Sequence, residues 1–131
     1  MKMIKVLALT ALVGTALFAQ EAMTQQMIKS EEGLNDIQKG FLYNNAALIR
    51  SGVATVKEAN ELFHNVEATK KYLPEDKMHM GNIAFNAAKR IDAAADELSL
   101  YLDANEYSKA QRSFTDIMTA CGSCHAVVRG W

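Results

Sequence analysis

The chain has 131 residues, half of them hydrophobic and 22% charged, and its formal net charge is −1. One proline and seven glycines are too few to end the many short strands of a β-sandwich or barrel, so the composition favours a single all-α domain. The basic residues are scattered among acidic ones, which excludes the basic patch typical of proteins that bind nucleic acid.

The first 19 residues have the pattern of an export signal. Two lysines precede an apolar run from Val6 to Ala19 that ends in small residues. This run is about 14 residues long, shorter than the roughly 20 that cross a bilayer as a helix, so a cleaved signal is favoured over a retained membrane anchor. We therefore expect residues 1–19 to be a signal peptide, residues 20–131 to form the mature domain, and the protein to reside in the periplasm.

Apolar residues recur at helical spacing along the mature chain. The first predicted helix covers about 21–50 and ends at Ser51-Gly52, because glycine accepts the left-handed conformation that commonly ends a helix. A second helix is expected over about 53–70. It is followed by Pro74, which suits the first turn of a new helix.

The third predicted helix covers about 74–102, and alanines dominate its apolar face, which leaves room for a close neighbour or a bulky ligand. Asn105 is expected to cap a fourth helix that continues almost to the C-terminus. Short connections between consecutive helices predict an antiparallel, up-down-up-down four-helix bundle. The end of the fourth helix then lies beside the start of the first.

The motif C-x-x-C-H, the attachment signature of c-type haem, lies near the end of the fourth predicted helix, at Cys121-Gly122-Ser123-Cys124-His125. Residues three and four positions apart share one helix face. We therefore predict one haem c per chain, with thioether bonds from Cys121 and Cys124 and with His125 as the proximal iron ligand. Both cysteines are used by the motif, so no disulfide is expected, and burial of the haem should contribute to stability.

Two other sites could use the same residues. A thiol redox pair normally lies at a helix N-terminus, where the helix dipole lowers a thiol pKa, whereas this motif lies near a helix C-terminus. A zinc site built from Cys121, Cys124 and two of His64, His79 and His125 would usually place its cysteines on loops. Both alternatives are less favoured than haem attachment.

With this motif at the end of the last of four helices, the mature chain resembles the class II c-type cytochromes, the cytochrome c-prime family and its low-spin relatives. In that family an arginine follows the histidine by four residues, as Arg129 follows His125 here. The resemblance implies that Arg129 contacts a haem propionate or shields the imidazole. It also implies a distal face covered by the first helix and a homodimer formed through the first two helices.

Members of this family differ in the residue that the first helix places at the sixth coordination position of the iron. A methionine there gives a six-coordinate electron carrier, and an apolar residue leaves a vacant site that admits diatomic gases. Counting from a helix end at Gly52 places Leu34 or Ile37 at the distal position, with Met27 about two turns nearer the N-terminus, and the arginine that commonly precedes the distal residue is absent. The candidates for the sixth ligand are Met27, Met23, His79, His64, Met78 and Met80, or none beneath Leu34 or Ile37.

The function that these features favour is electron transfer by one covalently bound haem, with redox proteins as transiently docked partners. No acid–base pair or nucleophile–base pair is recognisable beyond the haem motif, so the chain is expected to be a carrier and not an enzyme. The alternative is a five-coordinate haem protein that binds or scavenges small diatomic gases. In that case Leu34, Ile37 and Phe41 would line the distal side.

Overall fold

The computed structural model describes the backbone of residues 2–130 and the side chains of residues 17–130. Over the described backbone the chain is all-helical, as the sequence predicts, with five α-helices, two 3-10 helices and no strand. The α-helices are α1 (Lys2–Leu42), α2 (Ala46–Asn60), α3 (Val66–Tyr72), α4 (Gly81–Asp103) and α5 (Tyr107–Val128), and the 3-10 helices are η1 (Glu61–Phe63) and η2 (Glu75–Met80). No helix of the described part combines the length and apolarity needed to span a membrane.

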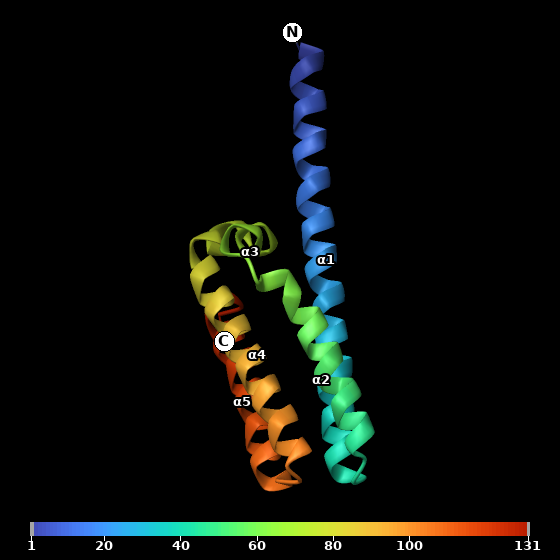
Figure 1. Cartoon of the computed structure of the whole chain (residues 1–131). Coiled ribbons are helices and arrows are strands. Elements are labelled where there is room, and N and C mark those ends of the chain that lie inside the picture. The colour runs from blue at the N-terminus through green and yellow to red at the C-terminus, as the bar shows by residue number, and fades with distance from the viewer. Residues whose placement is uncertain (1, 131) are drawn as a thin grey trace.

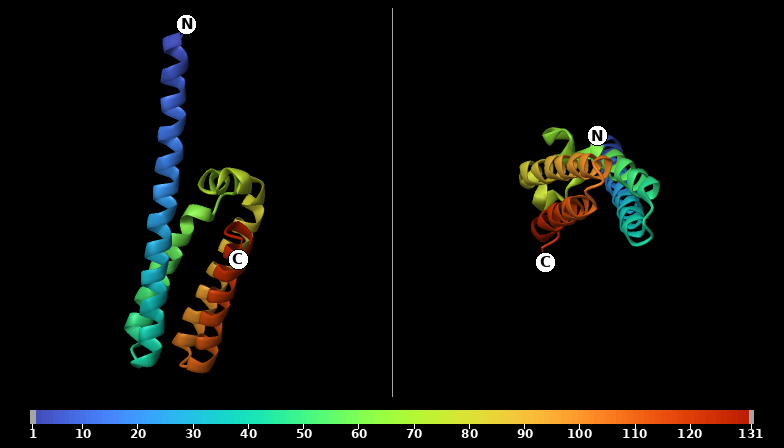
Figure 2. Two further views of the ribbon diagram at one scale, coloured as in Figure 1. Left: turned by 180° about the vertical axis from the view of Figure 1, so that it is seen from behind. Right: turned by 60° about the horizontal axis from the view of Figure 1, so that its bottom comes forward.

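The long helices form two antiparallel hairpins (Figure 1). Helices α1 and α2 make one hairpin, and α4 and α5 make the other. The hairpins meet mainly along α2 and α4, and the segment containing α3 connects them at the end away from the hairpin turns. The first part of α1 projects beyond the other helices (Figure 2).

Glycines allow the two helices of the first hairpin to pack closely. A Cβ atom on Gly52 would lie 2.5 Å from the backbone oxygen of Gly33, and one on Gly40 would lie 2.4 Å from the side chain of Ile49. Gly52 is therefore a buried contact inside α2. The prediction that the first helix ends at Ser51-Gly52 is wrong, because this glycine serves a helix crossing and not a helix end.

The first helix ends instead at Leu42, in a turn made by two asparagines. Asn44 adopts a left-handed conformation, with a φ of 54°. Asn45 caps α2, since its side-chain oxygen accepts a hydrogen bond of 3.0 Å from the backbone N–H of Leu48. The earlier end of α1 changes which of its residues lie level with the haem motif, and Met27 lines the same cavity as the motif.

Three further helix boundaries differ from the predictions. The helix expected over 74–102 begins as the 3-10 helix η2, and the α-helix α4 starts only at Gly81. The helix expected over 53–70 is broken after Asn60, and Asn65 caps α3 by accepting a hydrogen bond from the backbone N–H of Ala68. Asn105 has a φ of 57° and lies in the turn before α5, whose N-cap is Glu106. The prediction that Asn105 caps this helix is therefore wrong. It acts as a turn residue, because asparagine tolerates the left-handed conformation.

The main core fills the half of the molecule that contains the two hairpin turns. Phe41 and Phe114 pack there with ring centroids 6.2 Å apart. The half near α3 holds a smaller cluster centred on Leu73, Ala84 and Val128. The buried residues of the main core come from all four long helices and are Ile37, Ile49, Val53, Val56, Ala94, Ala95, Leu98, Leu102, Ala110 and Ile117.

Candidate functional site

A cavity of about 360 Å³, partly open to solvent, lies between the two hairpins in the less filled half of the molecule. Its volume is within the range of about 300–1,000 Å³ that is usual for small-molecule and cofactor sites. Its walls are mostly apolar. The lining residues are Thr24, Met27, Ile28, Ser30, Glu31 and Leu34 from α1, Asn60 and Phe63 from the end of α2 and from η1, Ala84, Ala87, Ala88 and Ile91 from α4, and Cys121, Cys124 and His125 from α5.

The C-x-x-C-H motif forms the α5 wall of this cavity. Helix α5 continues through the motif to Val128, so Cys121, Cys124 and His125 share one face and all three line the cavity. The two intervening residues do not. Ser123 is exposed and donates a hydrogen bond of 2.8 Å to the backbone oxygen of Thr119. A Cβ atom on Gly122 would meet no heavy atom within 4 Å.

Burial shifts the pKa of each of the three reactive groups of the motif toward the uncharged form. It raises the pKa of the Cys121 thiol, with a further rise from the neighbouring Cys124, and it raises the pKa of the Cys124 thiol. Burial also lowers the pKa of His125, and the positive charge of Arg129 lowers it further. Neutral imidazole is the form that binds metals. Thiols with a raised pKa are poor nucleophiles, which disfavours the redox-pair alternative.

Small side chains on α4 leave the space beside the motif open. Ala84, Ala87 and Ala88 are buried and line the cavity from the first half of this helix. They belong to the alanine face from which the sequence predicts room for a bulky ligand. Any longer side chain at these positions would extend into the cavity.

Two of the predicted distal residues line the cavity and one does not. Met27 and Leu34 form part of the α1 wall. Ile37 has no exposed surface and lies in the main core, as does its neighbour Phe41, which packs on Phe114. Placing Ile37 on the distal face is therefore incorrect, because that placement counted from a helix end at Gly52 and the true end is at Leu42.

The other predicted ligands lie away from this cavity. His79 is exposed on η2 and does not line it. Met23, Met78 and Arg129 line a different cavity, between α1, the α3–η2 connection and the end of α5. Arg129 is exposed at the C-cap of α5. Met80, on η2, is also absent from the lining of the haem-motif cavity.

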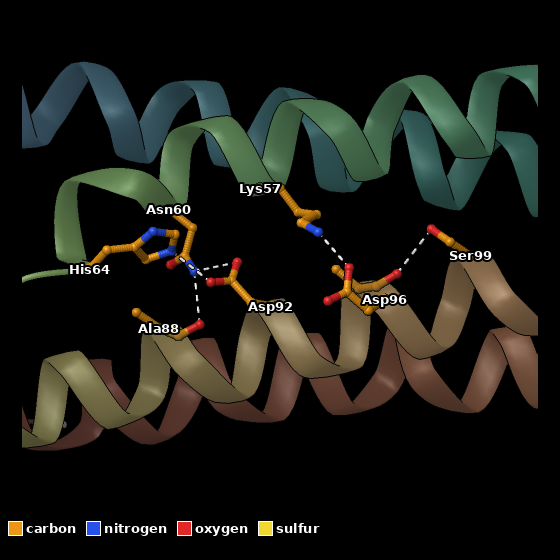
Figure 3. A network of polar contacts seen from close by, with 8 residues as sticks. Lys57, Asn60, His64, Ala88, Asp92, Asp96 and Ser99 are labelled. Carbon is orange, nitrogen blue, oxygen red and sulfur yellow. Dashed lines mark hydrogen bonds and ion pairs between the residues drawn. The ribbon is translucent and has the colours of Figure 1, made fainter.

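A polar network that the sequence analysis missed reaches the cavity wall (Figure 3). Asn60 is only 5% exposed and lines the cavity, and its amide nitrogen donates to the backbone oxygen of Ala88 at 2.8 Å and to Asp92 Oδ1 at 2.9 Å. Asp92 Oδ2 lies 2.6 Å from His64 Nε2. The signal in the sequence is an asparagine on the inward face of α2, where the other buried positions are apolar or small.

Comparisons of the chain with protein-family models, with curated proteins and with solved structures gave no match. In the part of the chain whose side chains are described, no group of three or more His, Cys, Asp or Glu residues is arranged to hold a metal ion. A covalently attached haem needs two thiols and one neutral imidazole beside an apolar cavity, and those are the groups that the α5 wall presents.

Proposed function

We propose that this chain is a periplasmic mono-haem c-type cytochrome that carries electrons between redox partners. One observation supports this proposal above all others. The two thiols and the imidazole of the C-x-x-C-H motif line the same wall of a partly open, mostly apolar cavity. The apolar walls would cover the faces of a flat apolar group, and the open side would leave an edge accessible for transient docking of a redox protein.

In this proposal α1, α2, α4 and α5 act as an up-down-up-down bundle with the haem near the C-terminal end of α5, as in the class II c-type cytochromes. The alternating directions of these helices support this arrangement (Figure 1). The predicted signal peptide falls in the part of α1 that projects beyond the other helices (Figure 2). Its removal would therefore leave both hairpins in place.

Each wall of the cavity has a role toward the haem. Cys121 and Cys124 would hold it through thioether bonds, and His125 would bind its iron. When bound, the haem supplies a reversible one-electron couple. Ala84 and Ala87 leave space for it on the α4 side, and the apolar lining would shield it in part from water, which strengthens the effect of nearby charges.

Met27 is the distal ligand that we propose. Of the six methionine and histidine candidates from the sequence, it is the one that lines the cavity. A thioether sulfur in the sixth position would give the low-spin, six-coordinate iron of an electron carrier.

The gas-binding alternative has one observation in its favour. Leu34 lines the same wall as Met27. An apolar residue over the iron would leave the sixth position vacant and the iron high-spin.

Absorption and electron paramagnetic resonance spectra separate these two functions. We expect low-spin, six-coordinate iron in the protein produced with a cytochrome maturation system, and conversion to high-spin iron in Met27→Ala. The matched control is Met78→Ala, which removes a partly exposed methionine that lines the other cavity and should leave the spectrum unchanged. High-spin iron in the unmodified protein would contradict the carrier function and favour gas binding.

A further inference from the structure

Two successive polar contacts connect the cavity wall with solvent (Figure 3). On the wall, the amide nitrogen of Asn60 donates to Asp92 Oδ1 at 2.9 Å. Behind it, Asp92 Oδ2 pairs with His64 Nε2 at 2.6 Å. The side chain of Asp92 is 23% exposed and that of His64 is 46% exposed. A half-shielded carboxylate therefore lies one hydrogen bond from the cavity, with an accessible imidazole on its other side.

The orientation of the Asn60 amide is fixed by its partners. Its nitrogen donates to two oxygen atoms, those of Ala88 and Asp92. Turning the amide over would place its own oxygen against both of these acceptors, which cannot donate a hydrogen bond while Asp92 is ionised. Asn60 is thereby held as a fixed link between Asp92 and the cavity.

This inference rests on the function proposed above. We propose that Asp92, linked to the cavity by Asn60 and paired with His64, lowers the reduction potential of the bound haem. A negative charge near the iron stabilises the oxidised state, which carries one more positive charge, and so lowers the potential. Asp92 is a tuning residue in this proposal and not an iron ligand.

Other charged groups surround this pair. Lys57 on α2 bonds to Asp96, and this hydrogen bond together with the charges of Asp96 and Asp92 raises the pKa of Lys57 against the opposing effect of burial. Lys57 therefore stays charged throughout pH 5–8 and contributes a constant offset. Glu31 on α1 and His125 on α5 also border the cavity.

The test is the midpoint potential of the haem-loaded protein at pH 7, measured by spectroelectrochemistry. In Asp92→Asn we expect reduction to become at least tenfold more favourable, which is a rise of about 59 mV for one electron.

The matched control is Asp96→Asn. Asp96 lies one turn along α4 from Asp92 and pairs with Lys57 on the same neighbouring helix, but it does not contact Asn60. In Asp96→Asn we expect the equilibrium constant for reduction of the haem to stay within about twofold of its value in the unmodified protein. A shift in Asp96→Asn as large as that in Asp92→Asn would contradict the proposal, because any surface charge would then have the same effect.

Two further outcomes are decisive. An unchanged potential in haem-loaded Asp92→Asn would overturn this inference alone, whereas a chain that carries no covalent haem would overturn the proposed function with it. If Asp92→Asn does not fold, Asp92→Ser decides the question, because it also removes the negative charge. An unchanged potential in that variant would contradict the inference.

Discussion

The two halves of the molecule are filled in different ways. Around the hairpin turns, Ile37, Leu98 and Ile117 are completely buried and pack tightly between the helices. In the other half, α4 presents alanines toward a cavity of about 360 Å³. The half around the hairpin turns, here called the filled half, fixes the register of the helices. The half around the cavity, here called the hollow half, leaves a volume that the side chains of this chain do not fill. A bound apolar group would complete the second half of the core.

The largest effect is expected when the hollow half loses its ligand. We expect Cys121→Ala with Cys124→Ala to abolish covalent attachment and to lower both helix content and melting temperature. Each 100 Å² of apolar surface that is no longer buried costs about 2.5 kcal/mol. Circular dichroism of the variant and of the haem-loaded protein provides the comparison. Equal helix content and equal melting temperatures would contradict this view of the hollow half.

Substitutions that change side-chain volume should act oppositely in the two halves. Leu98→Ala creates a cavity in the filled half and should cost about 2–5 kcal/mol. Ala87→Leu extends into the existing cavity, so it should cost much less but exclude the haem. Urea unfolding of the haem-free chain and the ratio of haem absorbance to protein absorbance measure the two effects. Normal haem loading in Ala87→Leu would show that the cavity is not the binding site.

The glycines of the filled half give a test of helix packing. We expect Gly52→Ala to destabilise the chain by about 1–3 kcal/mol, because the new methyl group would meet the backbone of Gly33. Gly122→Ala is the matched control, since it lies in a helix with open space around it and should stabilise by as much as about 1 kcal/mol. Thermal melting of the two variants, each as the haem-free chain, measures both effects. Similar changes of melting temperature in both variants would rule out the Gly33–Gly52 contact.

The smallest effect concerns pH and the haem-free chain. Burial lowers the pKa of His125 from its ordinary 6.5, so the unfolded chain takes up a proton first and stability falls as pH drops below about 6.5. Burial raises the pKa of Cys121 and Cys124 from 9.0, so stability also falls as pH rises above about 9. Urea midpoints at pH 5, 7 and 10 should therefore be highest at pH 7.

Variants at the same positions provide the control for this pH profile. His125→Gln should lose most of the acidic decline, and Cys121→Ser with Cys124→Ser should lose most of the alkaline decline. Profiles unchanged from that of the parent chain would assign the pH dependence to other groups.

The sequence was sufficient for the features that depend on local spacing. The low content of proline and glycine predicted an all-helical chain, and the spacing of Cys121, Cys124 and His125 predicted their common face. Helix ends were less predictable, because Gly52 can either end a helix or permit close packing, and only the facing Gly33 distinguishes the two. That single ambiguity displaced the first helix end to residue 50 and placed Leu34 or Ile37, and not Met27, nearest the motif. Leu34 and Met27 line the cavity, whereas Ile37 does not.

Contacts between distant segments were beyond sequence reasoning. The link from Asn60 through Asp92 to His64 joins residues of α2, of α4 and of the C-cap of η1 that only the packing of the two hairpins brings together. His79 illustrates the converse case. It was a sensible ligand candidate by residue type, but η2 leaves it exposed on the surface.

The claim on which the other proposals depend is that one haem is covalently bound at Cys121 and Cys124. The most direct measurement is the intact mass of the purified protein after expression with a working cytochrome maturation system. We expect the mass of the processed chain plus one haem, with the added mass located on the peptide that contains both cysteines. The mass of the bare chain would contradict the claim.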